Sequence, residues 1–279
     1  MGHKLKSLAE NHLKRAVGGW GRLLLDQLLP PRCLSCGAGV QDAGRICADC
    51  WKGLNFLQGP ACAWCGYPFE FGREFNQEFD QKFDQPGAVD GQCLCMACVA
   101  RRPPFDVARA ALRYDDGSRR MILSFKHGDR TDYTDFFGQL LQQAAAATPA
   151  PDLLADPLVI PVPLHKKRLG KRRYNQAALM ARALARRKKM DYVADMLART
   201  KHTPPQEGNY RRRKRNIAGA FAFNRRYGER ARGRNIILVD DVYTTGATAG
   251  ACARILKRNG VGYVTVLTLA RVCRPGDRA

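Results

Sequence analysis

From about residue 101 onward, hydrophobic residues follow two alternating patterns. Short apolar runs, typical of buried strands, occupy residues 106–115, 157–164, 235–241 and 263–271. Between them, apolar residues recur at helical spacing over residues 121–126, 136–147, 175–189 and 247–258. This alternation predicts an α/β domain whose parallel sheet carries helices on both faces.

The first 29 residues have a different pattern. Leu5, Leu8, Leu13 and Val17 fall roughly on one face of a basic amphipathic helix over residues 1–29. Such a helix packs on the body of the protein or contacts a membrane surface. The segment lacks a continuous apolar core of signal-peptide length, and no stretch of the chain reaches transmembrane length. We therefore expect a cytoplasmic protein, with peripheral contact at the inner face of the membrane as an additional expectation.

Cysteine pairs mark residues 30–100. Four C-x-x-C pairs are present: Cys33 and Cys36, Cys47 and Cys50, Cys62 and Cys65, and Cys95 and Cys98. This spacing lets two thiolates from one turn bind the same tetrahedral Zn²⁺, so four pairs predict two structural four-cysteine zinc sites. We expect sequential pairing, first with second and third with fourth, although a cross-braced arrangement and redox chemistry are open alternatives. Cys93 is a spare thiol that could replace Cys95 as a ligand.

The region between the third and fourth pairs, residues 70–92, is locally acidic and repeats phenylalanine every four residues. We interpret it as an insertion that forms a surface helix or stays mobile. The expected organisation is a basic helix over 1–29, a zinc-ribbon-like module with two four-cysteine sites over 30–100, and an α/β domain over 101–279.

The stretch IILVDDVYTTGAT, residues 236–248, combines features that suit a sugar phosphate. A buried strand ends in Asp240 and Asp241, a hydroxyl-rich turn follows, and a helix begins at once. The helix N-terminus and the threonine hydroxyls suit a phosphate, whereas the two acids suit the vicinal hydroxyls of a ribose or a hydrated Mg²⁺. The alternative is an ordinary α/β loop whose acids are merely solvated.

This stretch resembles the motif by which type I phosphoribosyltransferases bind phosphoribosyl pyrophosphate (PRPP). Further segments narrow the resemblance to the ComF family, also called GntX: residues 105–130, 160–177, 199–221 and 266–271. With the cysteines, the resemblance covers roughly residues 30–273. It implies a type I phosphoribosyltransferase-like domain, preceded by a small four-cysteine zinc-ribbon-like module, that binds PRPP with Mg²⁺.

The resemblance also implies which residues form the site. The PRPP loop would consist of nine consecutive residues: Asp240, Asp241, Val242, Tyr243, Thr244, Thr245, Gly246, Ala247 and Thr248. If the protein transfers a phosphoribosyl group, Asp240, Asp241, Lys126 and Arg211 would be its catalytic residues. The two cations, Lys126 and Arg211, would stabilise the departing pyrophosphate. Residues 161–169 correspond to the loop that binds pyrophosphate in this class of enzyme.

Residues 203–216 correspond to the flexible catalytic loop of the class, with Gln206 and Asn216 beside Arg211. Purine-salvage enzymes of this fold carry a third acid where this chain has Thr244. For that reason the sequence predicts a PRPP site but no acceptor base.

The formal net charge of +22 adds a polyanionic partner to these expectations. Basic residues cluster over 166–173 and 211–215, and Tyr174, Tyr210 and Phe221 lie close to those runs. Arginine with aromatic side chains attracts the backbone and stacks the bases of single-stranded nucleic acid. The plainer alternatives are a solvated basic face and aromatic residues that pack in the core.

Relatives in the family are implicated in natural competence, the uptake of DNA. The expected partners are therefore PRPP, single-stranded DNA, and a competence helicase or other DNA-uptake proteins. Two other functions stay open: an active phosphoribosyltransferase of nucleotide metabolism with an unknown acceptor, and a PRPP sensor without catalysis.

Overall fold

The computed structural model describes residues 30–69, 88–89, 92–127, 130–148, 156–165, 174–201 and 219–273. Contacts divide the chain into two compact units, Met1–Lys52 and Gly53–Ala279. The predicted N-terminal helix over 1–29, nearly all of the predicted insertion over 70–92, and the segment 203–216 lie outside the described residues. The predicted zinc module over 30–100 contributes to both units.

In the first unit, the described residues form two turns around the first two cysteine pairs. A backbone bridge joins Arg32 to Gly39 and closes the turn that carries the first pair. The short helix α2 (Ala48–Lys52) begins directly after Cys47. Gly37 has a φ of +79°, which brings the chain sharply back after the second cysteine of the pair.

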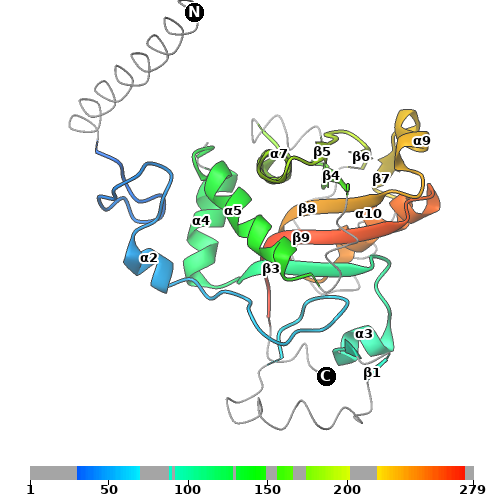
Figure 1. Ribbon diagram of the computed structural model, residues 1–279, viewed down its shortest axis with the longest axis horizontal. Helices are drawn as coiled ribbons and strands as arrows, with labels where there is room; N and C mark the ends of the chain where they lie inside the picture. The colour runs from blue at the N-terminus through cyan, green and yellow to red at the C-terminus, as the bar shows by residue number, and fades with distance from the viewer. Residues whose placement is uncertain are drawn as a thin grey trace, which may run out of the picture. The chain divides into compact units, whose positions relative to one another are not determined.

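The second unit is built on a five-stranded sheet with the order β3-β9-β8-β4-β5 (Figure 1). Its strands, in that order, are β3 (Val107–Arg113), β9 (Tyr263–Arg271), β8 (Asn235–Tyr243), β4 (Leu158–Pro161) and β5 (Asp191–Tyr192). All neighbouring strands run parallel, so the predicted parallel sheet is confirmed. β8 continues past the acids, because Val242 and Tyr243 pair in register with Ala270 and Arg271 of β9.

Helices cover both faces of this sheet. The helices are α4 (Asp116–His127), α5 (Tyr133–Ala146), α7 (Gln176–Lys188) and α10 (Ala247–Arg258). α5 and α7 pack against each other and on the sheet, and α10 packs on β8 and β9. Ile236 and Leu238 join the core cluster that contains Leu256 of α10. Because side chains alternate along a strand, Ile237 and Val239 face the opposite side.

Local capping explains where two of the helices begin. Asn175 accepts a hydrogen bond from the backbone N–H of Ala177 at 3.1 Å and caps α7. Before α4, the carboxylate of Asp115 accepts from the N–H of Ser118, and the Ser118 hydroxyl accepts from the N–H of Asp115. This reciprocal pair has the geometry of a capping box, which holds α4 at the end of β3.

Smaller elements complete the second unit. They are β1 (Ala88–Val89), β2 (Gln92–Cys93), α3 (Met96–Ala100), β6 (Leu197–Arg199), β7 (Phe221–Phe223), η3 (Arg225–Tyr227) and α9 (Gly228–Ala231). β6 pairs with β7, and β1 with β2, in antiparallel two-stranded ribbons that the hydrophobic pattern did not predict. No helix among the described residues is long and apolar enough to cross a membrane.

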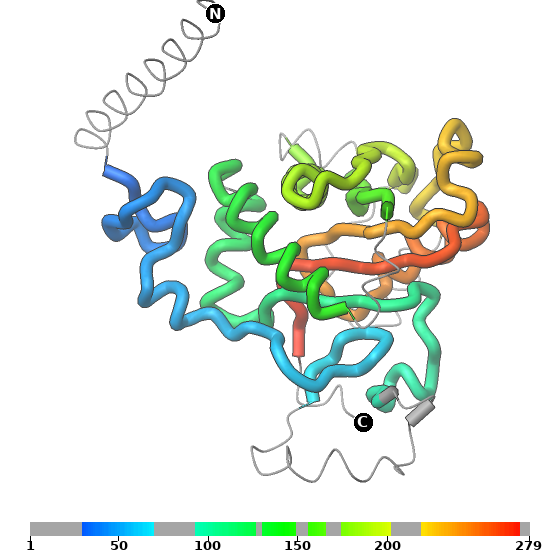
Figure 2. The backbone as a smooth tube through the Cα atoms, in the orientation of Figure 1, coloured from blue at the N-terminus to red at the C-terminus, as the bar shows by residue number. Residues whose placement is uncertain are grey.

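The segment that carries the third cysteine pair is hydrogen-bonded to β3, an edge strand of the sheet. The light-blue segment over 53–69 follows β3 (Figure 2), where the N–H of Leu57 donates to Ala111 O at 2.9 Å and the N–H of Ala108 donates to Trp64 O at 2.7 Å. Gly66 has a φ of +68°, and a Cβ at this position would overlap the backbone oxygen of Ala108. The turn that follows Cys65 therefore has room only for glycine.

Replacing this glycine should weaken the second unit selectively. Gly66→Ala combines a disfavoured positive φ with a backbone clash, so we expect the free energy of unfolding to fall by about 2 kcal/mol. The thermal midpoint of the main transition should fall by roughly 4–8 °C. Differential scanning calorimetry of the zinc-loaded protein measures this shift.

Gly37→Ala is the matched control. Gly37 occupies the same position after the first cysteine pair with a φ of +79°, but nothing lies within 4 Å of an added Cβ. It should leave the main transition unchanged. Equal effects of the two substitutions on that transition would contradict the close contact between Gly66 and β3.

Candidate functional site

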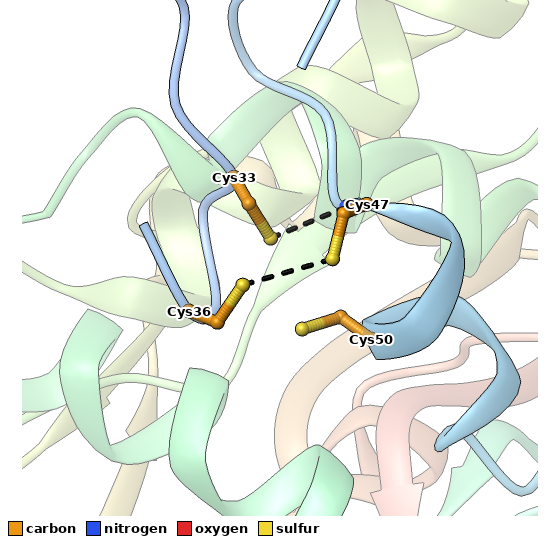
Figure 3. Close-up of side chains that lie close together, drawn as sticks. All are labelled: Cys33, Cys36, Cys47 and Cys50. Carbon is orange, nitrogen blue, oxygen red and sulfur yellow. Dashed lines mark hydrogen bonds between the residues drawn. The ribbon is translucent and has the colours of Figure 1, made fainter. Parts of the chain in front are cut away.

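The eight paired cysteines gather into two groups. One contains Cys33, Cys36, Cys47 and Cys50, and the other contains Cys62, Cys65, Cys95 and Cys98. Within each group the sulfur atoms all lie within 4.8 Å of one another, and Figure 3 shows the side chains of the first group pointing toward one another. Sequential pairing is therefore confirmed, and Cys93 belongs to neither group. Four convergent thiolates form a closed tetrahedral set that fits structural zinc.

The local geometry supports a thiolate at Cys33. In the first group the backbone N–H of Cys47 donates to Cys33 Sγ at 3.2 Å. Burial raises the pKa of the Cys33 thiol, but backbone N–H donors, including those of Cys36 and Cys47, outweigh burial and lower the pKa to about 6. All four sulfur ligands of the second group are buried, and the half-buried Cys273 packs against them.

The acidic pair lies at the carboxyl end of β8. Asp241 Oδ2 forms an ion pair with Lys126 Nζ of α4 at 2.8 Å, and both side chains are largely buried. Asp240 is half-buried, and its Oδ1 accepts a hydrogen bond from the N–H of Asp241 at 2.9 Å. The structure thus brings three of the four predicted catalytic residues together. Arg211, with Gln206 and Asn216, lies outside the described residues.

The charges around Asp240 shift its protonation. Burial raises the pKa of Asp240, and the negative charge of Asp241 raises it further, to about 7, although the positive charges of Lys126 and Arg199 oppose the shift. Arg199, at the end of β6, is a residue near the acids that sequence reasoning missed. Its only signal was a basic residue at the end of the short apolar run before 203–216.

The loop after β8 turns directly into α10. Gly246 has a φ of +70° and stands at the N-cap of α10, a conformation that glycine adopts without strain. Thr244 is exposed, whereas Thr245 and Thr248 are half-buried beside the first turn. The N–H groups of that first turn have no partners inside the helix, so they and the hydroxyls offer donors to an anion.

Tyr243, one of the nine predicted loop residues, points its side chain into the protein. Its ring meets Phe105 edge-on, with centroids 6.2 Å apart, and the guanidinium of Arg271 lies 4.3 Å from its centroid. Burial raises the pKa of the Tyr243 phenol. Tyr243 can therefore contact a ligand only through its backbone, while its buried side chain packs against the loop at Gly246.

The aromatic residues considered for base stacking have other roles where they are described. Phe221 is buried in the core that contains α10. Tyr174 is half-buried, with its ring 5.9 Å from that of Phe125 and its hydroxyl donating to Phe125 O at 2.9 Å. For these two the plainer prediction of core packing is confirmed. Tyr210 and the basic runs over 166–173 and 211–215 lie outside the described residues.

Comparison with known proteins agrees with these features. A family model described as a double zinc ribbon domain matches residues 24–99. Competence protein F of Haemophilus influenzae is 27% identical over 243 residues, which cover 86% of this chain and 96% of that protein. DNA utilization protein YhgH of Escherichia coli is 30% identical over 179 residues, which cover 63% of this chain and 77% of that protein.

Among solved structures, the allosteric regulatory enzyme of purine biosynthesis overlaps 53% of this chain and 30% of its own chain, with 15% identity and a TM-score of 0.35.

The parallel sheet, the acidic connection from β8 to α10 and the two four-cysteine groups define a type I phosphoribosyltransferase-like protein with a double zinc ribbon. Its similarity to competence protein F and YhgH places it more narrowly, and the chain belongs to the ComF family.

The raised pKa of Asp240 gives a prediction about pH. The folded-state pKa of Asp240 is about 7 and its ordinary value is 3.8, so the folded protein keeps this proton where the unfolded chain has lost it. The stability that Asp240 contributes is therefore complete below the unfolded pKa and is lost as the pH rises through the folded pKa. Asp240→Asn removes the charge at similar size, so its stability relative to the wild type should rise by about 1–3 kcal/mol between roughly pH 5 and pH 8.

Urea unfolding of both proteins at the two pH values measures this difference. Asp135→Asn, which changes a mostly exposed carboxylate, is the control and should show no comparable rise. The same stability difference between Asp240→Asn and the wild type at both pH values would contradict the raised pKa of Asp240 in the folded protein.

Proposed function

We propose that the protein binds PRPP with Mg²⁺ at the carboxyl edge of its sheet and acts in the cytoplasm in competence-related handling of single-stranded DNA. One observation carries the PRPP site: paired acids, a hydroxyl-rich turn, a glycine with positive φ and a helix N-terminus follow one another in the β8–α10 connection. Ligands of open parallel sheets bind beyond the carboxyl ends of the strands, where this connection lies.

The two ends of the connection suit the two ends of the ligand. The α10 N-terminus and the hydroxyls of Thr244, Thr245 and Thr248 suit the 5-phosphate. The carboxylates of Asp240 and Asp241 suit the ribose hydroxyls, and they are also the hard oxygen ligands that Mg²⁺ prefers. Bound Mg²⁺ would supply charge neutralisation at the diphosphate.

Lys126 has a second role in this proposal. Its ammonium pairs with the carboxylate of Asp241 at 2.8 Å. When ribose hydroxyls bind Asp241, that ammonium can turn toward the diphosphate, and Arg211 would approach from the segment 203–216. Thr244 stands where purine-salvage enzymes have a third acid, so the activity proposed for this site is the binding of PRPP.

The first test is calorimetric titration of the zinc-loaded protein with PRPP. We expect saturable binding that requires Mg²⁺. Asp240→Asn/Asp241→Asn should weaken it at least about a hundredfold, because two charged acceptors of the ligand are lost.

A matched double variant controls for the change in net charge. Asp191→Asn/Asp195→Asn also removes two carboxylates, which pair with Arg230 and Arg226 at the surface. It should bind PRPP like the wild type. If the Asp240/Asp241 variant binds as tightly as this control, the assignment of the ribose to the acidic pair is wrong.

The net charge of +22 supports the second part of the proposal, binding of single-stranded DNA. Family relatives are named as a competence protein and a DNA utilization protein. A protein that receives imported DNA would work with other DNA-uptake proteins, such as a competence helicase, on the inner side of the membrane.

Salt dependence tests DNA binding. Each phosphate contact should add about 0.7 to the slope of log affinity against log salt concentration. A variant with Arg211–Arg215 changed to glutamine should lose roughly tenfold in affinity for an oligothymidine and show a shallower slope.

The control removes the same number of charges from exposed positions: Arg182, Arg186, Lys188, Arg225 and Arg258. An equal loss in this control would mean that net charge, and not the segment 211–215, decides DNA binding.

A further inference from the structure

A buried arginine joins the second four-cysteine group to the candidate PRPP loop. Arg271 is the last residue of β9 and is only 6% exposed. Its Nη1 donates to Cys65 O at 2.5 Å, and its Nη2 lies 3.4 Å from Cys65 Sγ. On its other side, the guanidinium lies 4.3 Å from the ring centroid of Tyr243.

Tyr243 in turn touches the loop. A Cβ on Gly246 would overlap the phenol oxygen of Tyr243, so the backbone of Gly246 rests directly on that side chain. Gly246 is the N-cap of α10 and sets the direction of the N–H groups offered to a phosphate. The contacts therefore run without a gap from Cys65 through Arg271 and Tyr243 to Gly246.

The contact between Arg271 and the second four-cysteine group depends on the charge of the metal site. A Zn²⁺ ion with four thiolates carries net negative charge, which balances a buried guanidinium. When the metal leaves, the freed thiolates take up protons and the site becomes neutral, so Arg271 stays buried without a charged partner on the cysteine side. The first four-cysteine group belongs to the other compact unit, and the contacts from Cys65 to Gly246 do not include it.

We infer that Arg271 and Tyr243 are positioning residues through which zinc in the second cysteine group sets the geometry of the 244–248 loop and hence its affinity for PRPP. Zinc in the first group has no such effect. The inference rests on the proposed PRPP site, and it adds a specific dependence of that site on one of the two zinc ions.

The test compares variants in the full chain by two measurements, hydrogen–deuterium exchange of the amides over 244–250 and PRPP titration with Mg²⁺. Arg271→Gln should keep two zinc ions per chain by elemental analysis and keep the exchange of β4 and α7 unchanged. The variant loses the buried cation–π contact between Arg271 and Tyr243, and Tyr243 then supports the loop less firmly. Its loop amides should therefore exchange about tenfold faster, and its PRPP affinity should fall about tenfold. Arg258→Gln, at the exposed far end of α10, is the control for charge.

A pair of cysteine variants tests the metal itself. Cys98→Ser, in the second group, should loosen the loop as Arg271→Gln does, whereas Cys50→Ser, in the first group, should leave the loop as in the wild type. If Cys98→Ser unfolds the unit, Arg271→Gln alone decides the matter. Wild-type loop exchange in a zinc-loaded Arg271→Gln protein, or equal loosening by Cys50→Ser, would overturn the inference.

The two measurements separate this inference from the proposed function. If the wild-type protein does not bind PRPP, the proposed function fails. The exchange of the loop amides still decides whether zinc in the second group controls the loop.

Discussion

In the second unit, the contact between the second four-cysteine group and the sheet depends on the burial of one guanidinium, that of Arg271. An unpaired buried charge costs several kcal/mol, so its partners must stay in place whenever the unit is folded. Those partners are a carbonyl and a sulfur of Cys65 and the rings of Tyr67 and Tyr243. One side chain thus joins the second four-cysteine group, the end of β9 and the end of β8.

This constraint gives two cysteine groups of the same spacing different surroundings. The second group is buried and packs with Tyr67, Trp64 and Cys273, and its preceding segment pairs with β3. The first group has an exposed cysteine, Cys36, and lies in the separate unit that ends at Lys52. The segment over 53–69 also covers β3, which would otherwise present an open sheet edge to other chains.

Local chemistry explains which parts could be predicted from the sequence. α10 matches its predicted range, because Gly246 sets its start and Lys257, Arg258 and Gly260 mark its end. The cysteine spacing similarly predicts two four-cysteine groups. The three-residue strands β6 and β7 escaped prediction because a long segment separates them and neither has a clear period.

Long-range contacts explain what the sequence could not provide. The pair between Lys126 and Asp241 joins residues far apart in the chain, and the sequence identified both without placing them in contact. In the sequence, Arg271 only ends an apolar run, whereas in the structure its guanidinium donates a hydrogen bond to the backbone oxygen of Cys65. Spacing alone could not tell which cysteine group packs on the sheet, because both groups have the same C-x-x-C pairs.

The most direct measurement follows zinc release and sheet unfolding together during a denaturant titration, with a chromogenic chelator for the metal and circular dichroism for the sheet. The account predicts two steps: one zinc ion leaves before the sheet unfolds, and the second leaves in the same transition as the sheet. Release of both zinc ions while the sheet stays fully folded and cooperative would contradict the claim that the second cysteine group is part of the core of the phosphoribosyltransferase-like unit.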